Sequence, residues 1–92
     1  MAPTWANSAD KHGVDRRDAM YALLHPSYVR DMEDNGDGTV NRLYIGPEHA
    51  QTERELEVIV RVAVDGSGRK ANIFHVMQLG PAIRRYREEN PK

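Results

Sequence analysis

The chain contains no cysteine, so it cannot form a disulfide, a thiolate zinc site or a thiol nucleophile. It also lacks a long apolar segment. Its most apolar run, residues 56–64, includes an acidic and a basic residue and is far too short to span a bilayer. The amino-terminal residues lack the basic start and the apolar core of a signal peptide. These absences favour a soluble protein of the cytoplasm, where thiols stay reduced.

The chain also has almost no net charge. The 92 residues carry 13 Lys and Arg against 14 Asp and Glu, and the net charge of −1 gives no overall attraction to nucleic acid or membranes. The charges are nevertheless unevenly placed. Residues 1–60 carry six basic and eleven acidic side chains, whereas residues 61–92 carry seven and three. A basic final third can contact phosphates, although a solvated helix with exposed arginines would give the same pattern.

The length of the chain limits it to one domain, because domains usually span about 100–200 residues. We therefore expect a single domain over residues 1–92, which excludes a TIM barrel or a two-half Rossmann fold. Neither a glycine-rich phosphate-binding loop nor a serine nucleophile elbow occurs. Enzymes that use nucleotide cofactors are therefore disfavoured, and no cofactor is expected.

The spacing of apolar residues and turn signals predicts two helices and about four antiparallel strands. The first helix begins after Asp15, whose carboxylate can accept N–H groups of the first turn, and ends near His25 because Pro26 follows. The last helix begins at Pro81, a residue suited to the first helical position. This order indicates an α+β fold, a compact antiparallel sheet with an N-terminal and a C-terminal helix that is covered on one face. The four expected strands cover residues 28–32, 40–45, 56–64 and about 70–77.

His75 is the histidine that lies inside an apolar run of the last expected strand. Its surroundings depend on the hairpin register, because a slip of one residue exchanges the faces of the sheet. If Val64 pairs with Arg69, His75 lies opposite Val58 and belongs to the core. If the register is shifted by one residue, it lies opposite Ile59, on the face of the strand's charged residues, and can act as an acid–base group. Both registers remain open from the sequence.

Residues 31–37 have the spacing of the first part of a calcium-binding loop. The twelfth place of such a loop requires a bidentate glutamate, and this chain has Arg42 there. We therefore expect an acidic hairpin turn here and no metal site.

Several short motifs follow one another along the chain, and together they are more specific than any one of them. They are Lys11-His12-Gly13-Val14 with Asp18-Ala19, Arg42 with Gly46, the apolar residues 56–60, residues 72–77, and Arg84-Arg85-Tyr86. In this order they resemble the BrnT-like toxins of the RelE superfamily, which are ribonucleases of bacterial type II toxin–antitoxin systems. The resemblance extends from about Trp5 to Tyr86.

The resemblance implies a RelE-like fold and metal-independent cleavage of RNA, in which the ribose 2′-OH attacks the adjacent phosphate. Such a reaction needs a base, an acid and cations around the phosphorus. The chain departs from the family at Met77, where the family has arginine. Either His75 has taken over part of that role, or the protein does not cleave RNA. The expected catalytic residues are His75, Arg42, Lys11 and Arg84, and the expected RNA-binding residues are Arg61, Arg85, Tyr86 and Trp5. For cleavage of RNA we expect His75, Arg61 and Arg42 to lie on the same open face of the sheet.

The expected partners are RNA and a cognate antitoxin, with no membrane. We expect a homodimer or a toxin–antitoxin heterotetramer, and the residues do not select between them. The alternative function is a non-catalytic module on the same scaffold, which binds a protein through its sheet or an edge strand. A purely structural role is also open for the C-terminal motif, in which Tyr86 packs onto the sheet and Arg84 and Arg85 face solvent.

Overall fold

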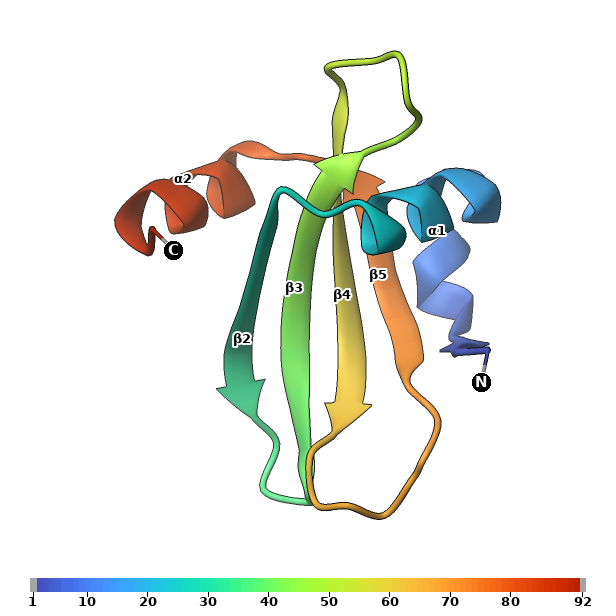
Figure 1. Ribbon diagram of the computed structural model, residues 1–92, viewed down its shortest axis with the longest axis vertical. Helices are drawn as coiled ribbons and strands as arrows, with labels where there is room; N and C mark the ends of the chain where they lie inside the picture. The colour runs from blue at the N-terminus through green and yellow to red at the C-terminus, as the bar shows by residue number, and fades with distance from the viewer. Residues whose placement is uncertain (1, 92) are drawn as a thin grey trace.

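A computed structural model describes residues 2–91 as one sheet flanked by helices (Figure 1). The strands lie in the order β1-β5-β4-β3-β2, and all neighbours are antiparallel except β1 and β5, which are parallel. The elements are β1 (Thr4–Trp5), a 3-10 helix η1 (Asn7–Asp10), α1 (Arg16–Leu24), β2 (Tyr28–Asp34), β3 (Thr39–Pro47), β4 (Glu55–Ala63), β5 (Asn72–Gln78) and α2 (Pro81–Glu89).

The predicted α+β class, the two helices and the four antiparallel strands are confirmed. The helix starts follow from local chemistry, since Asp15 Oδ1 accepts a hydrogen bond from the backbone N of Arg17 at 2.8 Å. The fifth strand, β1, was not predicted. It is only two residues long, so its sequence contains no alternation to detect, and its pairing with β5 is a long-range contact.

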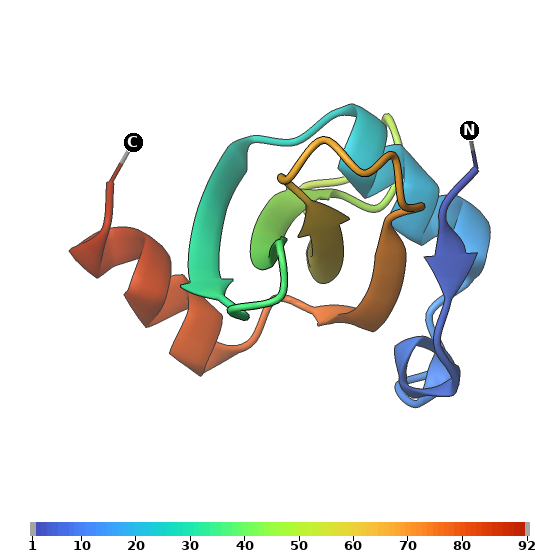
Figure 2. The same cartoon turned by 90° about the horizontal axis from the view of Figure 1, so that it is seen from below.

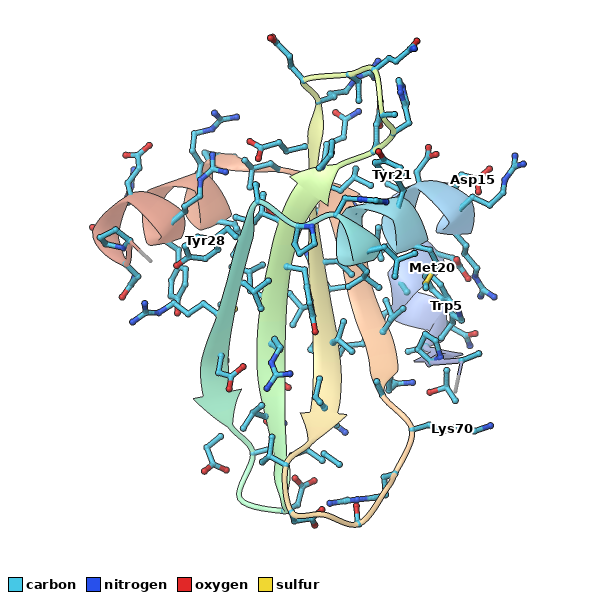
Figure 3. All side chains as sticks on the ribbon, viewed as in Figure 1. Trp5, Asp15, Met20, Tyr21, Tyr28 and Lys70 are labelled. Atoms are coloured by element: carbon cyan, nitrogen blue, oxygen red, sulfur yellow. The ribbon has the colours of Figure 1, made fainter. Side chains whose placement is uncertain are left out.

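The two helices lie on opposite sides of the sheet (Figure 2), which corrects the expectation of one covered face. We call these sides the α1 face and the α2 face. On the α1 face, Ala19 and Ala22 of α1 pack against a core of β4 and β5 side chains. On the α2 face, Ile83 and Tyr86 of α2 pack against a second core of three buried residues, Tyr28, Leu43 and Ile45. Tyr28, labelled in Figure 3, also donates a hydrogen bond from its hydroxyl to the Asn90 carbonyl after α2.

Gly46 sets how closely α1 approaches the sheet. A Cβ at this position would lie 2.5 Å from the backbone oxygen of Ala22, a distance that real side chains do not tolerate. We expect Gly46→Ala to lower the free energy of unfolding by about 1–3 kcal/mol, the usual cost of overpacking. Chemical denaturation measures this loss.

The matched control is Gly80→Ala. Its added Cβ would meet the flexible Met77 methyl group at 3.3 Å and Oε2 of Glu57 at 3.7 Å, which is an ordinary van der Waals distance. A Gly46→Ala variant as stable as the control would show that α1 does not pack as closely as described.

The pairing of β4 with β5 combines both registers considered above. Near the hairpin, Val60 lies opposite Ile73, which is the register that would place Val64 opposite Arg69. A register shift follows, and beyond it Ile59 lies opposite His75. Phe74 is the extra residue of this bulge. The bulge places His75 on the α2 face, away from the core beneath α1.

Candidate functional site

The imidazole of His75 is hydrogen-bonded to a buried carboxylate on the neighbouring strand. Its Nε2 lies 2.7 Å from Oε1 of Glu57, whose side chain is only 4% exposed, while the His75 side chain is 27% exposed. The second carboxylate oxygen, Oε2, accepts a hydrogen bond from the backbone N of Gly80 at 2.9 Å. Both oxygens of the buried carboxylate are therefore satisfied, and the imidazole is held at one nitrogen.

This geometry determines which His75 nitrogen can react. A carboxylate only accepts hydrogen bonds, so Nε2 carries the proton that is shared with Glu57. In the neutral ring, Nδ1 then holds the free lone pair. The register of β4 with β5 and the backbone N–H of Gly80 hold the pair in place. The pair fixes the orientation of the His75 ring, and a ring held in this way can act as a general base through Nδ1.

A second imidazole lies against the first. The ring centroids of His12 and His75 are 5.8 Å apart and their planes are inclined by 74°. His12 is exposed and belongs to the loop between η1 and α1. Ser8 in η1 holds this region against β5, because its Oγ donates to the carbonyl of the bulged Phe74 at 2.7 Å.

A cavity of about 460 Å³ opens beside His12. Met77, which stands where the resemblance predicts an arginine, contributes a thioether to its lining and no charge. The lining is acidic, with carboxylates from Asp15, Asp18 and Glu48. Glu48 is paired with Arg54 at 3.1 Å, so part of this charge is neutralised.

Arg42 lies on the opposite side of the sheet from His75. It pairs with Val60 on the α1 face, and its Nε donates to Oδ1 of Asp31 at 2.6 Å. The expectation that Arg42, Arg61 and His75 share one face is therefore wrong for Arg42. Strand alternation explains the result, since Arg42 and Leu43 point to opposite faces and Leu43 belongs to the core beneath α2.

The pairing with Arg42 predicts a pH dependence of stability. Hydrogen bonds from the guanidinium hold the pKa of Asp31 below its ordinary value. A carboxylate with a lowered folded-state pKa stabilises the fold above its unfolded pKa of about 3.9, and this contribution is lost as the pH falls through the folded-state pKa. Asp31→Asn should therefore unfold more easily at neutral pH, by less than about 1 kcal/mol because the pair is exposed to solvent.

Denaturation of both proteins between pH 7 and pH 2 tests this effect, and the two stability curves should converge at the acid end. Asp34→Asn, on the same strand, is the control for loss of one negative charge. A difference that stays constant over the whole range would contradict the ion pair.

Trp5 is also on the α1 face (Figure 3), because its pairing partner in β5 is Ile73, which lies in the core beneath α1. The Arg16 guanidinium lies 4.9 Å from the centre of the indole ring, so this face of the ring already holds a cation. The structure thus places Trp5 and Arg42 on one face and His75 on the other.

The other candidates lie in several places. Arg61 is exposed on the α2 face, two residues along β4 from Ile59, or about 7 Å at the rise of a strand. Tyr86 packs against the core beneath α2. Arg84 lines a cavity of about 420 Å³ at the start of α2. Lys11 and Arg85 are exposed, the first beside His12 and the second on α2.

Glu57 and His12 were not among the expected site residues. A glutamate within the most apolar strand was a signal that its carboxylate needs a partner. His12 belongs to the Lys11-His12-Gly13-Val14 motif, but only the folded chain brings it to His75.

Within residues 2–91, no three histidine or carboxylate side chains gather so as to hold a metal ion. The α-helices of this described part, α1 and α2, lack the length and apolarity to cross a membrane. Comparisons with protein-family models, with curated proteins and with solved structures found no significant match to the chain.

Proposed function

We propose that this chain is the cytoplasmic toxin of a type II toxin–antitoxin system, a metal-independent endoribonuclease of the BrnT-like, RelE-like kind. The observation that carries the proposal is the His75–Glu57 pair, with 2.7 Å between Nε2 and Oε1. A partly exposed imidazole held in one orientation by a buried carboxylate is an arrangement that suits general base catalysis.

The reaction needs only protein side chains. His75 Nδ1 takes the proton of the ribose 2′-OH, the 2′-oxygen attacks the adjacent phosphorus, and the bond from phosphorus to the 5′-oxygen breaks. The departing 5′-oxygen takes up a proton, so the products are a 2′,3′-cyclic phosphate and a 5′-hydroxyl, and neither a metal nor a redox partner is needed. The negative charge that develops on the phosphate oxygens needs a cation, and we assign this role to Arg61, which is exposed on the α2 face two residues along β4 from Ile59, the pairing partner of His75.

A motif of the family resemblance lies next to the His75–Glu57 pair, so two independent observations point to the same region of the surface. The Lys11-His12-Gly13-Val14 motif forms the loop that contacts the His75 ring. The cavity beside His12 is lined by carboxylates, which repel phosphate. We therefore place the scissile phosphate outside it, over the exposed edges of the two imidazoles. A cognate antitoxin that covers the exposed imidazoles of His12 and His75 would block the reaction.

The decisive experiment uses the purified full chain and a mixed-sequence RNA in the presence of EDTA. Cleavage into fragments that end in 2′,3′-cyclic phosphate supports the proposal, and expression of the intact chain should arrest growth of a bacterial host. Intact RNA together with normal growth would overturn it.

A second function is favoured by a separate observation. Three large apolar side chains are exposed to solvent, Leu24 at 70%, Val64 at 55% and Val29 at 43%. Val29 lies on the α1 face opposite Tyr44, on β2, the strand at one edge of the sheet. A non-catalytic module would bind a protein there. Such a module would leave RNA uncut, and substitution of Val29 by a charged residue would release its partner.

A further inference from the structure

We propose that His12 is a second catalytic residue, which donates a proton to the departing 5′-oxygen while His75 takes the proton of the attacking 2′-OH. This inference rests on the proposed function and deepens it, because it names the acid that the reaction requires. It also gives a role to a residue that the expected site did not include.

The first argument is the distance between the two rings. Proton transfer requires each ring nitrogen to come within about 2.6–3.2 Å of its oxygen. Imidazoles whose centroids lie 5.8 Å apart, with planes inclined by 74°, can reach two oxygens bound to one phosphorus. Both side chains are accessible, since His12 is exposed and His75 is 27% exposed.

The second argument is that the loop of His12 is fixed on both sides. Before it, β1 pairs with β5, and Ser8 donates to the Phe74 carbonyl. Across the loop, Arg16 donates to both oxygens of Asp10, at 3.1 and 2.7 Å. Gly13 turns the chain between them with a φ of +71°, which favours glycine. These anchors hold the His12 ring beside β5 although the ring itself is exposed.

The third argument is the division of roles. Glu57 is hydrogen-bonded to His75 and not to His12, so it stabilises the imidazolium that forms when His75 accepts the 2′-OH proton. His12 delivers its proton to the 5′-oxygen as the bond to phosphorus breaks. His75 thus gains one proton and His12 loses one. Proton exchange with the solvent then returns both rings to their starting protonation states.

The test compares two substrates with different leaving groups. The first is a short RNA, whose 5′-oxygen must be protonated as it leaves. The second is uridine 3′-(4-nitrophenyl phosphate), whose nitrophenolate departs without a proton. We expect His12→Ala to lose at least about 100-fold in rate on RNA and to keep most of its rate on the nitrophenyl ester. His75→Ala should lose activity on both substrates, because both reactions need the base.

His25→Ala is the matched control, since its ring stacks on Tyr21 at the end of α1 and should not affect either rate. His12→Gln serves as a second variant, with circular dichroism to verify folding. If His12→Ala loses both activities equally or keeps both, His12 is not the acid, although the proposed function would stand. If the intact chain cleaves neither substrate, the proposed function fails and this inference fails with it.

Discussion

His75→Ala is expected to cleave RNA about 10²–10⁴ times more slowly than the intact chain, which is the usual contribution of general acid–base catalysis. The ring is a poor candidate for a structural role alone, because its side chain remains 27% exposed while its partner carboxylate is almost fully buried. Initial rates on a fluorescent RNA in EDTA measure the loss, and growth of the expression host reports it in cells.

Arg42→Ala provides the control for this experiment. The resemblance makes both residues catalytic, but Arg42 lies on the α1 face in a pair with Asp31. We therefore expect Arg42→Ala to keep most of the activity and to lose only a little stability. Equal losses in the two variants would show that RNA binds across both faces or around an edge. That result would contradict a site confined to the α2 side of β5.

Glu57→Gln is expected to reduce the rate by as much as about 10⁴-fold, as found when an orienting carboxylate is replaced by its amide and the wrong tautomer results. The backbone N–H of Gly80 needs an acceptor, so the amide oxygen should keep that place. The amide NH₂ group would then point at Nε2 of His75 and donate to it. The ring proton would move to Nδ1, and the lone pair that acts as the base would be lost.

Two measurements separate this effect from a loss of folding. The rate constant kcat should fall while KM changes little, because Glu57 does not contact RNA. Nitrogen NMR of His75 should show a proton on Nε2 in the intact chain and on Nδ1 in Glu57→Gln. Glu55→Gln, on the same strand and paired with Arg87, is the control. A Glu57→Gln variant that retains its activity would overturn the assignment of His75 as the base.

The sequence predicted the scaffold well because its signals are local. Asp15 caps α1 and Pro81 begins α2, as their chemistry requires, and the alternating residues of β4 identify its buried side. The site was predicted less well, because it depends on how strands that are distant in sequence pair and therefore on which face of the sheet each side chain occupies. Arg42 was expected beside His75, yet each strand alternates independently and only the pairing of β3 with β4 decides its face.

The position of His75 illustrates why a pattern alone was insufficient. Two uniform registers were considered, and the chain adopts one in each half of the β4–β5 hairpin. A bulge requires one residue more on β5 than on β4, and neither strand contains a glycine or proline that would signal it. The Glu57 carboxylate favours the observed register, because Glu57 would be buried without a side-chain hydrogen-bond partner if His75 pointed to the other face.

The bulge at Phe74 assigns two contacts to two different residues of β5. His75 faces Glu57, and Phe74 provides the carbonyl that binds Ser8. The pairs on either side of it, Val60 with Ile73 and Ile59 with His75, are adjacent on β4. Phe74 is thus equivalent to a one-residue insertion that leaves the ladder otherwise complete. Its carbonyl is the group that binds Ser8 and anchors the amino-terminal segment. Loss of this residue would leave His75 facing its carboxylate but would remove the Ser8 anchor of the His12 loop, which would then be held by the pairing of β1 with β5 and by the contact of Arg16 with Asp10.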